Sequence, residues 1–150
     1  MNTDTKRHEQ TLLRVALRNA IAQASDEQLE QDQFQQLAQR LANTKLDNSQ
    51  FRNLENLAYT TDKISDITDL LKKLTGRDSR GRGWASENLG QQVIFALVDL
   101  RKKADDIVKN IPDHMRGAID ADLPRRVHLE LCRELVKHLT AEFMYKKPKE

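Results

Sequence analysis

The stretch "DLPRRVHLELCRELVKHLTAEF", residues 122–143, shows most directly what kind of fold this chain adopts. Apolar residues recur along it at every fourth position, at Val127, Leu131, Leu135, Leu139 and Phe143. This spacing predicts an α-helix with one apolar face, because an α-helix turns once in about 3.6 residues. Asp122 is suited to cap the start of the helix, and Pro124 fits its first turn, where a missing N–H has little effect.

The same periodicity covers most of the preceding chain. Apolar stripes occur over residues 12–24, 34–41, 51–74 and 89–111. Each stripe predicts a helix that buries one face, and Pro112 is expected to stop the last of the four.

Polar residues between the stripes supply the expected helix ends. Ser25 and Gln28 form a capping-box pattern that predicts the start of the second helix. Gly76 is expected to end the long helix over residues 51–74 in the left-handed conformation, and Ser86 is the expected start of the next one. The cap of the long helix is expected at Asp47, Asn48 or Ser49.

Together these elements predict an all-α fold. Because every apolar stripe must be covered and the joins are short, we expect a compact antiparallel bundle of about five helices in a single domain, residues 1–150. The two long helices on either side of residues 76–84 are expected to form its central hairpin, which would place that segment at one end of the molecule.

Composition agrees with a helical protein and restricts its functions only loosely. Of the 150 residues, 38% are apolar and only 5% aromatic, which argues against a β-sandwich. The net charge of +2 allows an anionic partner without requiring one. Cys132 is the only cysteine, so an internal disulfide is excluded and a reducing compartment is favoured. The sequence contains no secretory signal and no apolar run of membrane length, so we expect a cytoplasmic protein without membrane contact.

The segment "GRDSRGRGW", residues 76–84, interrupts the helical pattern. It places Arg77, Arg80 and Arg82 among three glycines and ends on Trp84, the only tryptophan. Arginine offers a planar donor fork to phosphate, glycine lets the backbone approach a ligand, and tryptophan can stack on a base. The segment therefore has two interpretations: a nucleic-acid-binding loop, or a solvated turn with Trp84 anchored in the end of the bundle.

Other cationic residues extend this candidate surface. Lys72 and Lys73 precede the segment directly, whereas residues 101–103 and Arg125-Arg126 lie further along the chain. Cations that share one face neutralise phosphates without reading bases, and the resulting affinity weakens with salt. Each cluster alone is typical of an ordinary solvated helix surface.

Two groups of residues raise the question of a metal site. An acidic row in the long third helix consists of Glu55, Asp62, Asp66 and Asp69. A straight row does not converge on a cation. His128 and Cys132 are one helical turn apart, which suits zinc, but they bring no third or fourth ligand. Since the chain also lacks a phosphate-binding glycine loop, a nucleophile elbow and an HExxH motif, we expect no metal, no cofactor and no catalytic residues.

The segment "NSQFRNLENLAY", residues 48–59, resembles the start of the major helix in the small helical subunits of type III CRISPR effector complexes. The resemblance rests on Ser49-Gln50-Phe51-Arg52 after a polar cap. The long helix that follows, the basic residues between helices and the terminal "EFMYKKPKE" are similar in manner. The resemblance implies a helical bundle that stacks along a ribonucleoprotein filament and touches the guide–target duplex or the target strand through basic residues. It makes Arg52 a candidate contact, whereas residues 76–84 do not align to the family.

Two functional hypotheses follow. The first is a non-catalytic subunit of an RNA-guided ribonucleoprotein that binds the backbone of single-stranded RNA or of a guide–target duplex nonspecifically. Its contacts would be Arg52, Lys72, Lys73, Arg77, Arg80 and Arg82, with Trp84 stacking or anchoring the loop. Its glutamine-rich and acidic faces would contact other subunits and copies of itself. The second is a helical protein-binding adaptor or antitoxin-like module. An enzyme would require a cleft that joins His128, Glu134 or the acidic row to groups of another helix.

Overall fold

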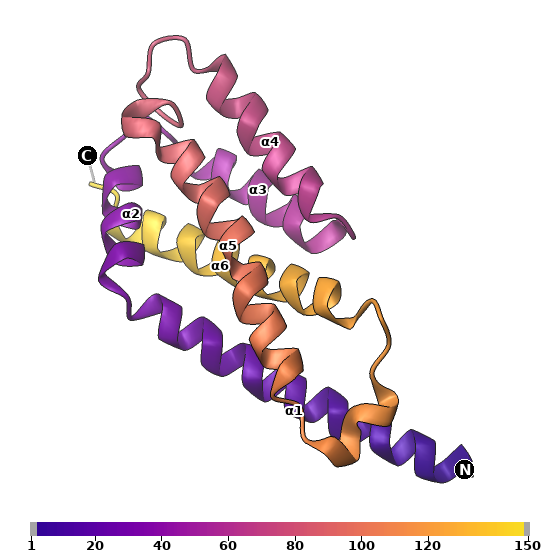
Figure 1. The fold of residues 1–150 in the computed structure, drawn as a ribbon. Coiled ribbons are helices and arrows are strands. Elements are labelled where there is room, and N and C mark those ends of the chain that lie inside the picture. The colour runs from indigo at the N-terminus through magenta and orange to yellow at the C-terminus, as the bar shows by residue number, and fades with distance from the viewer. Residues whose placement is uncertain (1–2, 149–150) are drawn as a thin grey trace.

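The computed structural model describes residues 3–148, and all regular elements in that range are helical (Figure 1). They are α1 (Thr3–Leu29), α2 (Asp32–Ala42), α3 (Asn48–Thr60), α4 (Ile64–Arg77), α5 (Leu89–Lys109), α6 (Leu123–Lys146) and the 3₁₀ segments η1 (Ser86–Asn88) and η2 (Asp113–Ala118). The predicted all-α class is confirmed. The expected number of about five helices is too low, because the long third helix is divided in two.

The core is organised around α6, which packs against α1, α2, α3 and α5. The apolar residues that recur at every fourth position of α6 are buried. Each is at most 3% exposed: Val127, Leu131, Leu135, Leu139 and Phe143. A helix that contacts several others buries more than one narrow stripe. Accordingly, α6 also buries Leu129, Cys132 and Val136.

Three aromatic rings join distant parts of the chain inside this core. Phe51 of α3 stacks on Phe143 of α6 with ring centroids 4.0 Å apart, and it lies 5.2 Å from the ring of Trp84. Each of the three side chains is at most 1% exposed. Because Trp84 ends the 76–84 segment, this cluster fixes one end of that segment to the core.

The first helix is longer than the sequence predicts, and Ser25 does not cap a second one. α1 continues to Leu29, and Ser25 lies inside it with only 6% of its surface exposed. α2 begins after Gln31, whose side chain makes no capping hydrogen bond. The capping-box expectation is wrong because a capping residue needs an extended backbone, whereas the buried Ala24 and Ser25 hold this turn helical against the core.

The predicted long helix over residues 51–74 is also wrong, since α3 and α4 are separated at residues 61–63. Arg133 of α6 stabilises the break. Its Nε donates to the carbonyl of Ala58 at 2.8 Å, and a terminal nitrogen donates to the carbonyl of Thr61 at 3.0 Å. A side chain from a distant helix thereby satisfies carbonyls at the end of α3, where intrahelical partners run out.

An aspartate was among the residues expected to cap α3 and α6, but only α3 has such a cap. Among the three residues expected to cap the third helix, the cap is Asp47, which forms a capping box with Gln50. Asp122 makes no capping hydrogen bond at the start of α6. Its backbone has φ −88° and ψ −8° and is not extended as a capping residue requires, and its carboxylate accepts two hydrogen bonds from Arg125, at 2.7 and 2.9 Å.

The segment between α4 and α5 departs from the expected backbone at both ends. Gly76 lies within α4 and is not left-handed; the positive φ angles in residues 3–148 occur at Gly81, Glu87 and Asn88. α5 begins at Leu89 after the turn η1, and therefore not at Ser86. The expected helix boundaries here are wrong by a few residues because they depend on how the segment folds back on the core.

The α4–α5 connection places the segment 76–84 at one end of the molecule (Figure 1). α4 packs against α5 as expected, but the more extensive partner of α5 is α6, which it crosses steeply in Figure 1. The pair α5–α6, and not the α4–α5 hairpin, is thus the centre of the fold. Gly90 lets α5 approach α4 closely, since a Cβ at this position would lie 2.0 Å from Oγ1 of Thr75.

Candidate functional site

Residues 76–84, here called the basic loop, fold around an internal carboxylate. Oδ2 of Asp78 accepts the backbone N–H of Gly83 at 2.8 Å and of Ala85 at 2.9 Å, and Oδ1 accepts that of Arg82 at 3.2 Å. These hydrogen bonds, that from Ala85 foremost, lower the pKa of Asp78. The backbone N–H groups of Arg82, Gly83 and Ala85 are therefore used by the protein itself and do not face a ligand.

The far end of the basic loop is packed and not loosely solvated. Trp84 is 1% exposed, so its ring is closed to a stacking base in this structure and anchors the loop instead. A Cβ on Gly83 would lie 2.9 Å from Cδ2 of Leu46, so a larger residue would have to displace the Leu46 side chain. The N–H of Lys45 donates to the carbonyl of Arg82 at 2.8 Å. The C-terminal end of the loop is thus held against the core, while the side chains of its arginines are exposed.

The three arginines of the basic loop are exposed and unpaired. Within residues 3–148, no carboxylate oxygen lies within 4.0 Å of the guanidinium nitrogens of Arg77, Arg80 or Arg82. Arg77 and Arg82 line a shallow depression of about 350 Å³ together with Lys45. We call this surface, with the adjacent Arg80, the basic end. Lys45 was missed in the sequence because it stands alone in a polar turn and joins the arginines only through the fold.

The other predicted phosphate contacts are less closely grouped. Lys73 and Arg77 are four residues apart in α4 and therefore lie on one side of that helix, while Lys72 is turned to another. Arg52 lies on α3, and it does not line the depression although its neighbour Gln50 does. All three of Arg52, Lys72 and Lys73 are exposed. The structure brings Arg77 and Arg82 together with Lys45 around one depression and leaves Arg52 outside it.

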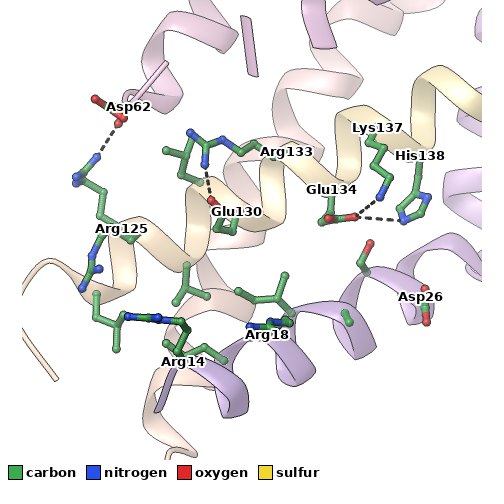
Figure 2. A pocket seen from close by; sticks show the side chains of 18 residues that line it. Arg14, Arg18, Asp26, Asp62, Arg125, Glu130, Arg133, Glu134, Lys137 and His138 are labelled. Atoms are coloured by element: carbon green, nitrogen blue, oxygen red, sulfur yellow. Dashed lines mark hydrogen bonds and ion pairs between the residues drawn. The ribbon is translucent and has the colours of Figure 1, made fainter. Parts of the chain in front are cut away.

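A larger concave surface, the α1/α6 groove, lies between α1 and α6 and has a volume of about 770 Å³ (Figure 2). Arg14 and Arg18 line it from α1, and Arg125 and Arg126 line it from α6. Arg125 and Arg126 are the cations that the sequence offered as an extension of the basic surface, whereas the groove lining includes none of Arg52, Lys72, Lys73, Arg77, Arg80 and Arg82. It is separate from the basic end.

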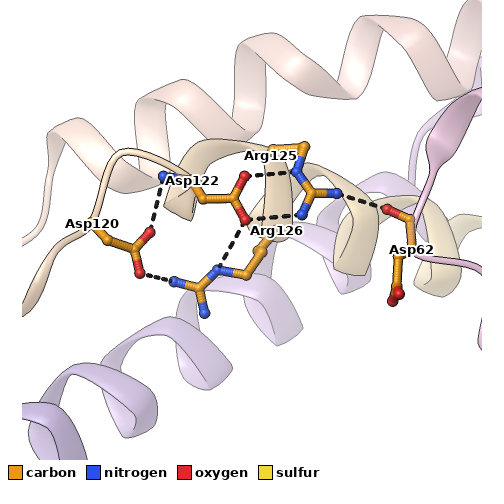
Figure 3. Close-up of polar contacts among 5 residues, drawn as sticks. All are labelled: Asp62, Asp120, Asp122, Arg125 and Arg126. Carbon is orange, nitrogen blue, oxygen red and sulfur yellow. Dashed lines mark hydrogen bonds and ion pairs between the residues drawn. The ribbon is translucent and has the colours of Figure 1, made fainter.

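Four other cations, two on α5 and two at the start of α6, form ion pairs within the chain. On α5, Arg101 pairs with Asp105 at 3.0 Å and Lys102 with Asp99 at 3.1 Å. At the start of α6, Figure 3 shows Arg125 bound to Asp122 and Arg126 bound to Asp120, both at 2.7 Å. Arg125 also donates to the backbone carbonyl of Asp62 at 2.7 Å. These clusters have internal partners that the arginines of the basic end lack.

The acidic row is dispersed by the break between α3 and α4. Asp62 lies in the linker, and Asp66 accepts a 2.5 Å hydrogen bond from the hydroxyl of Thr61, so the side chains do not form one straight line. Within the described residues, no three His, Cys, Asp or Glu side chains converge on a position where a metal ion could be held.

His128 and Cys132 face the core together. Nε2 of His128 lies 2.8 Å from the carbonyl of Leu97, and the thiol of Cys132 contacts the same oxygen at 3.5 Å. Burial raises the pKa of Cys132 to about 12, which keeps it a neutral thiol, and lowers the pKa of His128. Glu134, which lines the α1/α6 groove, pairs with His138 at 3.6 Å. These groups are engaged in packing and pairing.

Comparisons of the chain with known protein families, with curated proteins and with solved structures found no match. The assignment of a site therefore rests on the residues and their geometry. None of the helices among residues 3–148 combines the length and apolar character needed to cross a membrane.

Proposed function

We propose that this protein is a non-catalytic subunit of an RNA-guided ribonucleoprotein of the type III CRISPR kind, and that its basic end holds a nucleic-acid strand by its phosphates. One observation carries the proposal: the loop arginines lack carboxylate partners among residues 3–148, whereas Arg101 and Lys102 of α5 and Arg125 and Arg126 of α6 have them. An arginine without such a partner remains free to form charge-assisted hydrogen bonds with phosphate.

The geometry of the loop favours side-chain contacts with the backbone of the strand. Asp78 accepts the backbone N–H groups of Arg82, Gly83 and Ala85, and Trp84 is buried, so these amides and the indole ring do not contact the strand in this proposal. Guanidinium contacts to phosphate position a strand without reading its sequence. Binding is therefore nonspecific with respect to sequence, and its affinity decreases as salt increases. In this proposal Lys45 and Lys73 add phosphate contacts beside the arginines, and Arg52 and Lys72 contact the same strand further away.

Contacts with neighbouring subunits are assigned to the face between α2 and α5. Phe95 and Val98 of α5 are 64% and 52% exposed there. They border a hollow of about 840 Å³ that α2 lines with glutamines and with Phe34. Large exposed apolar side chains beside polar ones are typical of protein interfaces. In this proposal the face binds other subunits of a cytoplasmic complex, further copies of this chain included.

The same face supports a second candidate function, a helical adaptor or antitoxin-like module without nucleic-acid binding. In that case the unpaired arginines of the basic end pair with carboxylates of an acidic partner protein, and the Phe95–Val98 surface supplies the apolar part of the interface. The two candidates differ in whether the isolated protein binds RNA.

An RNA titration of the basic end tests the proposal. The variant R77A/R80A/R82A should bind single-stranded RNA of about 20 nucleotides about tenfold or more weakly near 100 mM salt, for every sequence tried, because three phosphate contacts are lost. The slope of log affinity against log salt should become less steep by about 2, since each contact on a single strand contributes about 0.7. Fluorescence anisotropy of labelled RNA measures both quantities, and an RNA duplex serves as a second ligand.

The matched control is R101A/K102A, which removes two exposed cations that already have carboxylate partners. Its RNA affinity and salt dependence should stay close to those of the unchanged protein. Equal binding by the loop variant and the control would exclude the basic end from the function. Absence of RNA binding by the unchanged protein at physiological salt, together with capture of an acidic protein that needs the loop arginines, would favour the adaptor.

A further inference from the structure

The α1/α6 groove has the length of a short helix. Its lining residues extend from Arg14 to Asp26 on α1 and from Leu123 to His138 on α6. At a rise of about 1.5 Å per residue these spans correspond to about 18 Å and about 22 Å. Figure 2 shows side chains of both helices along it. The groove is thus an elongated trough as long as a helix of three to four turns, whereas a small ligand would occupy only part of it.

The floor of the groove is apolar and incompletely covered. Leu17 and Ile21, which belong to the apolar stripe of α1, are only half-buried, and they line the groove together with the buried Val127. Ser25 continues their row one turn further. It is 6% exposed, and its hydroxyl has no hydrogen-bond partner among the described residues. An amphipathic helix with part of its apolar stripe open gains from a further partner that covers it.

The charges on the rim are ordered along the groove. Glu130 is paired with Arg133, and Glu134 is paired with Lys137 at 3.5 Å. Arg14 and Arg18, one helical turn apart on α1, have no carboxylate within ion-pair distance in residues 3–148. In Figure 2 Arg14 lies toward one end of the groove, Arg18 lies nearer its middle and Asp26 lies toward the other end. The unpaired positive charge of the groove therefore lies in the part lined by Arg14 and Arg18.

We propose that the α1/α6 groove binds an amphipathic helix of a partner protein, with apolar residues on the floor and acidic residues against Arg14 and Arg18. Helices dock in apolar grooves through residues at three- and four-residue spacing, and the rows Leu17–Ile21–Ser25 and Arg14–Arg18–Ala22 have this spacing on the receiving side. Complementary charge on the rim fixes the register and speeds association. This site is distinct from the basic end and does not depend on nucleic-acid binding there.

A designed peptide tests the proposal. The probe is a fluorescein-labelled helical peptide of about 15 residues, with leucines at three- and four-residue spacing and flanking glutamates, and its partner probe has lysines in place of the glutamates. We expect the acidic peptide to bind and the basic one to bind far more weakly. R14E/R18E should weaken the acidic peptide about tenfold or more and should reverse the preference between the two peptides.

Two further variants locate the binding. Ala22→Trp fills the groove at an exposed position and should reduce binding of the acidic peptide without affecting folding. K6E/R7E makes the same change of charge on α1 outside the groove and should bind as the unchanged protein does. Binding that is insensitive to R14E/R18E and to Ala22→Trp, or no binding of the acidic peptide, would overturn the proposal. Pyrophosphate or RNA that binds in the groove and requires Arg14 and Arg18, with no peptide binding, would also overturn it.

R14E/R18E separates this proposal from the one for the basic end. RNA affinity that persists in this variant while peptide binding is lost would leave the basic end supported and assign the groove to a protein helix. Loss of RNA binding in R77A/R80A/R82A with unchanged peptide binding would show the two sites to be independent.

Discussion

At the scale of single residues, burial in the folded protein disfavours the protonated form of His128. The imidazole is 7% exposed, and its Nε2 lies 2.8 Å from the Leu97 carbonyl. Burial is the main cause that lowers the pKa of His128 below its ordinary value of 6.5; nearby Arg101 acts in the same direction, while the Leu97 hydrogen bond and Asp105 oppose it. Below pH 6.5 the unfolded chain binds a proton at this residue that the folded chain resists, so acid favours unfolding.

We therefore expect the free energy of unfolding to decrease as the pH falls from about 7 to about 5, and to decrease less in H128Q. Glutamine retains an N–H that can donate to Leu97 but does not titrate. Urea unfolding at several pH values measures the difference. H114Q, at an exposed histidine, is the control and should keep the pH dependence of the unchanged protein. An identical pH dependence in H128Q would remove His128 as its source.

At the scale of elements, the close packing of α4 against α5 depends on a glycine, Gly90, at their contact. Gly90 lies in the first turn of α5, and a Cβ there would meet Oγ1 of Thr75 at 2.0 Å and the Trp84 carbonyl at 3.1 Å. The Thr75 hydroxyl is itself held by a 2.7 Å hydrogen bond to Leu71 within α4. The helices must separate to admit even one methyl group.

G90A should lower the free energy of unfolding by about 1–3 kcal/mol through overpacking, although alanine favours a helix more than glycine does. Adding T75A should recover part of the loss, because the closest contact is removed. G76A is the matched control: a Cβ at Gly76 meets no atom within 4 Å, so this change should be neutral or raise stability by about 0.5–1 kcal/mol. Denaturant unfolding compares the three, and equal effects of G90A and G76A would contradict the packing argument.

At the scale of the whole molecule, side chains at the C-terminal end of the chain donate hydrogen bonds to backbone carbonyls far from them in sequence. Arg133 binds the carbonyls of Ala58 and Thr61, and Lys147 donates to the carbonyls of Thr44 and Leu46 at 2.7 Å each. Lys147 also lies 5.2 Å above the ring of Phe143. One helix thus holds both ends of the α3 region, and with them the turn that contributes Lys45 to the basic end.

R133M should lower the free energy of unfolding by about 1.5–3 kcal/mol, because methionine retains the packing of the stem while two helix-end carbonyls lose a charged donor. R126M is the control, since Arg126 makes only exposed ion pairs and its replacement should change stability by less than about 1 kcal/mol. Thermal or urea unfolding measures both. Equal stability of the two variants would show that the Arg133 contacts add nothing to the fold.

The helical class and the buried stripes follow from the sequence alone, because three- and four-residue periodicity is a local property that each segment carries by itself. A cap at Asp47, Asn48 or Ser49 and the cationic residues of the basic loop could be predicted for the same reason, whereas only the structure showed which of the three residues forms the cap. The ion pairs of Arg101 and Lys102 also lie within one helix, at spacings of four and three residues.

Only the tertiary structure decided where the third helix breaks, how the basic loop folds and which cations stay unpaired. Arg133 from α6 donates to carbonyls at the break, Trp84 of the loop packs in a ring cluster with Phe51 and Phe143, and Lys45 lines one depression with Arg77 and Arg82. Such contacts join residues far apart in the chain, and no local pattern encodes which distant donor will reach a given carbonyl. The periodicity of apolar residues therefore determined which face of each helix is buried, while long-range packing decided which other helices that face contacts.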